Sequence, residues 1–73
     1  MKVTAYIAED HLEILDTLFV KGDKVYISPS IRVMDGSMDY GRKVFDQNKN
    51  YLGLIRDSSF DEKIEPFLSE ITN

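Results

Sequence analysis

The sequence of 73 residues contains no cysteine, carries a formal charge of −4 and is 42% apolar. These values predict one globular domain over residues 1–73, because a chain this short cannot bury two separate cores. The lack of cysteine excludes a disulfide scaffold and a thiolate zinc site. The apolar N-terminus meets Glu9 and Asp10 too soon to be a secretion signal, so we expect a cytoplasmic protein.

The first twenty residues hold one clear strand and one ambiguous segment. Residues 2–8 alternate in character, which is typical of a half-buried strand. One side of this strand consists of Val3, Ala5 and Ile7. Residues 9–20 fit a short helix, because apolar side chains recur at helical spacing opposite carboxylates. The apolar ones are Leu12, Leu15, Leu18 and Phe19. The helix is favoured here, and a strand broken at Asp16 is the alternative.

The middle of the chain alternates strands with turns. Residues 21–23 form a glycine-containing turn, and residues 24–28 then alternate with their two aliphatic side chains inward. Pro29 ends this strand, because proline has no N–H to donate to a ladder. The alternation resumes at residues 31–33 and stops at a second turn. Residues 35–41 hold two glycines and are expected to form a mobile loop.

A hairpin and a helix complete the predicted elements. Residues 42–46 and 51–56 read as two strands, joined by the polar loop 47–50. The C-terminal residues return to a helical period, whose apolar positions are Ile64, Phe67, Leu68 and Ile71. We expect this helix to begin near Pro66, because proline is tolerated in a first helical turn.

This order of elements resembles small SH3-like barrels over residues 20–67. The sequence therefore predicts a mainly β domain, a small and partly open SH3-like barrel with a C-terminal helix. The alternative is an α+β domain with an extra helix near residues 9–20. Because small barrels carry out unrelated functions, the resemblance does not imply one.

Residues for metal or catalytic chemistry are sparse. His11 is the only histidine, so a zinc site would lack its usual ligands. Asp46, Asn48 and Asn50 have the spacing of a calcium loop, but the glycine that such a loop needs is replaced by Tyr51. No nucleophile motif and no phosphate-binding glycine motif is present. We expect a protein that is not an enzyme and that uses no cofactor.

Charge is distributed unevenly along the chain. Residues 21–56 carry an excess of cations, whereas both ends carry an excess of carboxylates. The cations alternate with aromatic residues, which are Tyr26, Tyr40, Phe45 and Tyr51. Cations beside aromatic rings fit a single-stranded nucleic acid, through phosphate attraction and base stacking. The acidic ends instead fit a protein that imitates the phosphates of DNA.

The favoured hypothesis is a small accessory or regulatory protein that binds another protein. Loops on a rigid scaffold are where binding residues gather, which points to the surface over residues 35–51. The candidate partner-binding residues there are Tyr40, Arg42, Lys43, Lys49 and Tyr51. A nucleic-acid-binding barrel and an acidic DNA mimic are the alternatives. An exposed strand edge also predicts self-association. The many residues with AT-rich codons are compatible with a low-GC bacterium or its phage.

Overall fold

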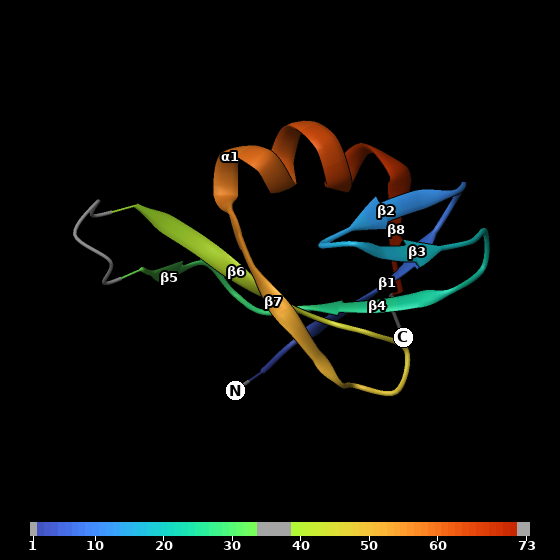
Figure 1. The fold of residues 1–73 in the computed structure, drawn as a ribbon, viewed down its shortest axis with the longest axis horizontal. Helices are drawn as coiled ribbons and strands as arrows, with labels where there is room; N and C mark the ends of the chain where they lie inside the picture. The colour runs from blue at the N-terminus through green and yellow to red at the C-terminus, as the bar shows by residue number, and fades with distance from the viewer. Residues whose placement is uncertain (1, 34–38, 72–73) are drawn as a thin grey trace.

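The computed structural model describes residues 2–33 and 39–71. The strands are β1 (Thr4–Ala8), β2 (Leu12–Ile14), β3 (Thr17–Phe19), β4 (Lys24–Ile27), β5 (Ile31–Arg32), β6 (Tyr40–Phe45), β7 (Tyr51–Arg56) and β8 (Leu68–Glu70). One helical segment, residues 57–67, joins β7 to β8. It consists of α1 (Asp57–Ser59), the π-helical η1 (Phe60–Ile64) and the 3-10 turn η2 (Glu65–Phe67). The fold is a small, mainly β domain with one C-terminal helical segment (Figure 1).

The main sheet is antiparallel and is built around β6. One edge of β6 pairs first with β5 and then with β4, and its other edge pairs with β7. The order continues from β4 to β1 and then β8. No pairing between the described parts of β7 and β8 closes the sheet into a barrel. β4 and β5 are separated at Pro29, as the sequence predicts.

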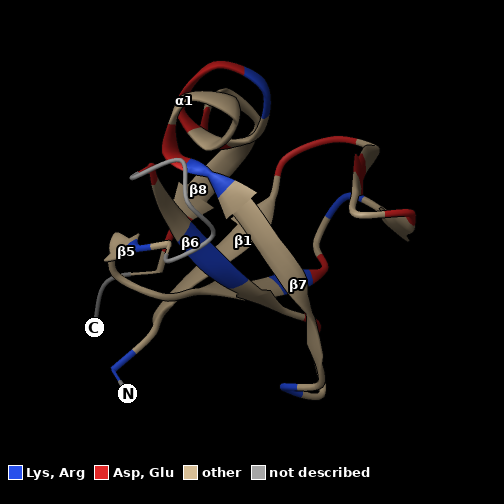
Figure 2. Cartoon of the chain, turned by 60° about the vertical axis from the view of Figure 1, so that its left-hand side comes forward, with Lys and Arg blue, Asp and Glu red and all other residues tan. Residues whose placement is uncertain are grey.

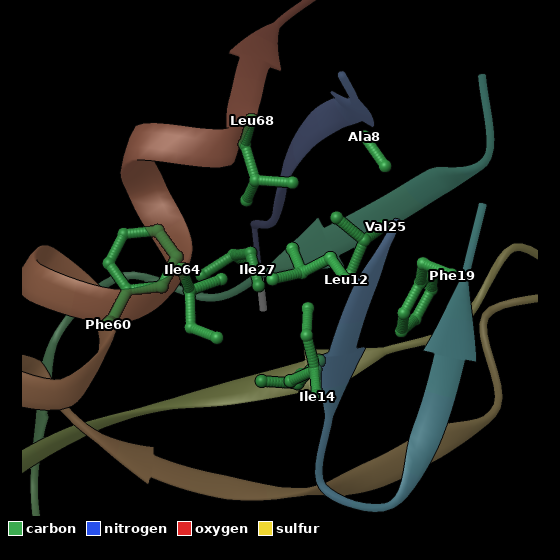
Figure 3. Close-up of a cluster of buried hydrophobic side chains, with 10 residues drawn as sticks. Ala8, Leu12, Ile14, Phe19, Val25, Ile27, Phe60, Ile64 and Leu68 are labelled. Atoms are coloured by element: carbon green, nitrogen blue, oxygen red, sulfur yellow. The ribbon is translucent and has the colours of Figure 1, made fainter. Parts of the chain in front are cut away.

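The hydrophobic core lies on one face of this sheet. The helical segment and the β2–β3 hairpin lie over that face (Figure 1), and side chains from both meet those of the sheet (Figure 3). The buried hydrophobic residues are Ala8, Leu12, Ile14, Phe19, Val25, Ile27, Val44, Phe60, Ile64 and Leu68. The inward prediction for Val25 and Ile27 is confirmed, since they are 0% and 1% exposed.

The predicted helix over residues 9–20 is wrong, because this segment forms the β2–β3 hairpin. Leu15 and Asp16 have φ angles of 50° and 64°, so the chain reverses in a two-residue turn of the kind that matches strand twist. The reversal directs Ile14 and Phe19 into the core, where they are 1% and 2% exposed. A continuous helix would have placed Leu18 beside them, whereas Leu18 is 62% exposed.

The C-terminal helix is also displaced from its predicted position. The helical segment begins at Asp57 and ends at Phe67, so Pro66 lies in its last turn and not in its first. The backbone becomes extended at Leu68, and β8 pairs with β1. If the helix continued past Phe67, the N–H and C=O groups on this edge of β1 would have no partners. Pairing with β8 supplies them. The β6–β7 hairpin is confirmed.

Of the glycine-containing segment 35–41, the structure describes residues 39–41. Residues 34–38 lie outside the described residues, so the predicted mobile loop is not tested there. Gly41 belongs to β6, where a Cβ atom would come within 2.7 Å of the Ile55 carbonyl oxygen. Glycine is therefore required by the close approach of β7. Within residues 2–33 and 39–71, no helix is long and apolar enough to cross a bilayer.

Phe60 anchors the helical segment to the sheet, and its side chain is 0% exposed. Its replacement by alanine is expected to lower the free energy of unfolding by about 3–5 kcal/mol, because it leaves a cavity under the segment. Phe67 ends the same segment and is 45% exposed, so Phe67→Ala should cost less than about 1 kcal/mol. Urea titration followed by circular dichroism measures both. Equal losses would contradict the anchoring role of Phe60.

Candidate functional site

The face of the sheet opposite the core carries aromatic rings and lysines. Val25 and Val44 point into the core, so their neighbours Tyr26 and Phe45 point to the other face. Both rings are only partly buried. A sheet face of this kind usually carries polar side chains, because it meets water. The rings therefore make this outer face the strongest candidate for a binding surface.

The strand register aligns these rings in one row. Ala5 pairs with Tyr26, Tyr26 with Phe45, and Phe45 with Tyr51. Directly opposed residues share a face, so the row crosses β1, β4, β6 and β7. The rings of Phe45 and Tyr51 lie 5.6 Å apart and are tilted by 54°. Tyr51 is 57% exposed. We call Ala5, Tyr26, Phe45 and Tyr51 the aromatic row.

The loop between β6 and β7 brings Lys49 to this row. The Asp46 carboxylate accepts the N–H of Asn48 at 2.9 Å and that of Asn50 at 2.8 Å, which closes the loop. Lys49 has a φ of 65°, and its N–H donates to the Asp46 carbonyl oxygen. The ammonium of Lys49 then lies 5.2 Å from the ring centroid of Tyr26, at cation–π distance.

A shallow hollow lies beside the row. It has a volume of about 360 Å³ and is open to solvent. Val3, Tyr26, Phe45 and Lys49 line it. An apolar side chain of a partner fits such a hollow, and the lysine at its rim fits an adjacent anionic group.

Only part of the predicted site gathers on this face. Tyr51 belongs to the row, Lys49 lies over Tyr26, and Lys43 lies on the same face as Phe45 because it is two residues away on β6. Tyr40 is 54% exposed but has the opposite orientation on β6, since it alternates with Gly41 and Lys43. The hollow beside Tyr40 is a separate one, which Asp39, Arg56, Asp57 and Ser58 also line.

Arg42 lies between the sheet and the helical segment. Its guanidinium carbon is 5.1 Å from the ring centroid of Phe60, and Nη1 donates to the Ser28 carbonyl oxygen at 3.3 Å. Nε lies 3.8 Å from Oδ1 of Asp57, an ion pair without a hydrogen bond. The side chain is 28% exposed. These contacts give Arg42 a structural role in holding the helical segment, beyond what its sequence position indicates.

Sequence reasoning did not identify Val3 and Ala5 as part of the face. The pairing of Tyr6 with Val25 places Tyr6 on the core side of β1, so Val3 and Ala5 lie on the outer side. The regular alternation of β1 was the available signal. It does not reveal which of two partly apolar sides is covered, because Tyr6 and Ala8 also pack well in a core.

Half of the described acidic side chains lie on the core-covering elements. Glu13 and Asp16 belong to the β2–β3 hairpin, and Figure 2 shows Asp and Glu along the helical segment and cations along β6. In the described part of the chain, no three histidine or carboxylate side chains are grouped as metal ligands would be. Asp46 of the calcium-like spacing instead caps its own loop.

Comparison with known proteins gives no assignment: no protein-family model, no curated protein and no solved structure matches this chain. The functional argument therefore depends on the geometry of the outer face.

The Asp46 cap predicts a pH dependence. The N–H of Asn50 is the main cause that holds the pKa of Asp46 below its usual value of 3.8. Because the folded pKa is lowered, the stabilising effect is complete above pH 3.8 and is lost as pH falls through the folded pKa. We expect the amide signals of Asn48 and Asn50 to shift with a midpoint below 3.8 in an NMR acid titration.

Asp46→Asn is the control for this titration. It retains an acceptor oxygen but has no carboxylate to protonate, so the same amide signals should show no step. A wild-type midpoint at or above 3.8 would contradict the cap.

Proposed function

We propose that this chain is a small cytoplasmic accessory or regulatory protein, without catalytic activity, that binds another protein through the outer face. The aromatic row carries this proposal. Tyrosine is enriched at the energetic centres of protein interfaces, and Tyr51 is more than half exposed. Tyr51 is not a scattered exposed residue, because it continues the row of Tyr26 and Phe45, and a contiguous apolar patch is typical of an interaction site.

The shape of the face favours a protein over a stacked base. Phe45 and Tyr51 are tilted by 54°, and the Lys49 ammonium lies over the face of Tyr26. Neither arrangement offers a flat platform for successive bases. The hollow of about 360 Å³ between Val3 and Phe45 instead accepts a single inserted side chain. We infer a partner with an apolar anchor residue and a carboxylate that approaches Lys49.

The finer fold is part of the proposal. We propose that the sheet is an open SH3-like barrel, in which the hairpin β2–β3 fills the first long connection and the helical segment fills the last. The strand order β7, β6, β4, β1, β8 supports it. Such a scaffold holds the aromatic row on strands and not on loops, which reduces the conformational entropy lost on binding.

Loss of the Tyr51 ring should weaken partner binding. We expect Tyr51→Ser to reduce capture of the specific protein partner at least about tenfold, because an interface aromatic commonly contributes 2 kcal/mol or more. Tyr40→Ser is the matched control, since Tyr40 is comparably exposed but lies outside the row. The measurement is a tagged pull-down from a lysate of the source organism, with nuclease present, read by quantitative mass spectrometry.

Three results of this pull-down would count against the proposal. Equal capture by wild type and Tyr51→Ser would remove the aromatic row as the binding surface. A loss with Tyr40→Ser alone would move the site to the separate hollow beside Asp39. No partner in the nuclease-treated lysate would contradict protein binding. Circular dichroism establishes that both variants are folded.

Single-stranded nucleic acid is the second candidate, and Lys43 and Lys49 beside aromatic rings are the observation that favours it. This candidate predicts oligonucleotide affinity that falls linearly with salt on a log–log plot. Lys49→Glu should weaken such binding, whereas Lys63→Glu on the helical segment should not. Fluorescence anisotropy with labelled oligothymidine measures both. The acidic groups are divided between hairpin and helical segment, so no comparable observation favours a DNA mimic.

A further inference from the structure

The free edge of β7 has backbone groups without partners. Lys43 is opposite Leu54 in the β6–β7 ladder. The N–H and C=O of Lys43 bond in the other direction, to the hydroxyl and the N–H of Ser28. In an antiparallel ladder, such a pair exchanges no hydrogen bonds, so the N–H and C=O of Leu54 point away from β6. No hydrogen bond from the described residues reaches them.

β7 has one feature that protects an edge strand, a bulge at Leu52 in its pairing with Val44 and Phe45, and it lacks the others. It is six residues long and uncharged from Tyr51 to Ile55, and none of its side chains is fully buried. The other described edges are shorter: β5 has two residues, and β8 has three that end in Glu70. Proteins normally protect a long edge with lysine, proline or a covering element, because exposed N–H and C=O groups recruit another strand.

The geometry points to a second copy of this chain as the strand that pairs with β7. We infer a two-fold dimer in which β7 pairs antiparallel with β7 of the other copy, centred on Leu54. The outward N–H of each Leu54 then donates to the Leu54 carbonyl oxygen of the other copy. A two-fold axis perpendicular to the sheet keeps the outer faces of both copies on the same side.

The sequence of β7 is complementary to itself in this register. On the C-terminal side of the bulge at Leu52, Leu54 meets Leu54 and Gly53 meets Ile55, so no like charges are opposed. A charged strand from another protein would find no opposite charge between Tyr51 and Ile55. The apolar, uncharged strand therefore matches its own copy better than it matches a charged segment.

A cysteine at the two-fold axis tests the register directly. The chain has no native cysteine, so Leu54→Cys gives one thiol in each copy. The Cα atoms of a hydrogen-bonded antiparallel pair lie about 5.5 Å apart, within the range that a disulfide spans. We expect Leu54→Cys to form a covalent dimer under mild oxidation. Ser69→Cys on the exposed edge of β8 is the matched control and should form no covalent dimer, because its thiol lies away from the β7 pairing.

Sedimentation equilibrium tests the same proposal without a cross-link. The full-length wild type should show a concentration-dependent monomer–dimer equilibrium. Leu54→Lys places a charge on each side of the axis and should raise the dissociation constant at least about tenfold. Circular dichroism distinguishes a folded monomer from an unfolded variant. If Leu54→Lys unfolds, the comparison of Leu54→Cys with Ser69→Cys tests the dimer instead.

Several results would overturn the dimer. A wild type that stays monomeric up to millimolar concentration would do so. The dimer would also be overturned if Ser69→Cys formed a covalent dimer as fast as Leu54→Cys. Assemblies larger than a dimer would contradict a closed two-fold pairing. Because the aromatic row and the β7 edge are tested by different variants, failure of one proposal leaves the other intact.

Discussion

The packing of Phe60 between helical segment and sheet is the interaction on which the rest of the fold depends. Its ring meets the Tyr6 ring edge-on at a centroid distance of 6.1 Å and lies under the Arg42 guanidinium. Burial is the main cause that raises the pKa of Tyr6, and the nearby Glu70 carboxylate adds to it. Both causes favour the neutral phenol, which packs against the core. These contacts link β1, β6 and the helical segment at one point.

Covering of the core face by helical segment and hairpin leaves the second face of the sheet without a layer. A short chain cannot cover both faces, because it has too few residues for a third layer. The exposed face is therefore expected to carry polar side chains or to serve as a binding surface. Here Lys43 and Lys49 supply charge, while Ala5, Tyr26, Phe45 and Tyr51 supply apolar area. This combination is typical of a surface that is covered intermittently.

Local patterns predicted the elements whose structure depends on neighbouring residues. The β6–β7 hairpin followed from two alternating runs and a polar loop, and the strand break at Pro29 followed from a missing N–H. The strands on either side of Leu15 and Asp16 were only the alternative prediction, because the apolar spacing also fitted a helix and leucine seldom adopts positive φ. The inward position of Arg42 depends on Phe60 and Asp57, which are distant in sequence, so no local signal encodes it.

The proposed recognition through the aromatic row would depend on complete folding of the sheet. Its members come from β1, β4, β6 and β7, so no hairpin or fragment contains the row by itself. Formation of the row requires β1 to pair with β4 and β4 to pair with β6. Such non-local pairing is formed late and cooperatively in small β domains. Under the proposed function, partly folded chains would present no recognition surface, and a partner that binds the row would discriminate native molecules from incomplete ones.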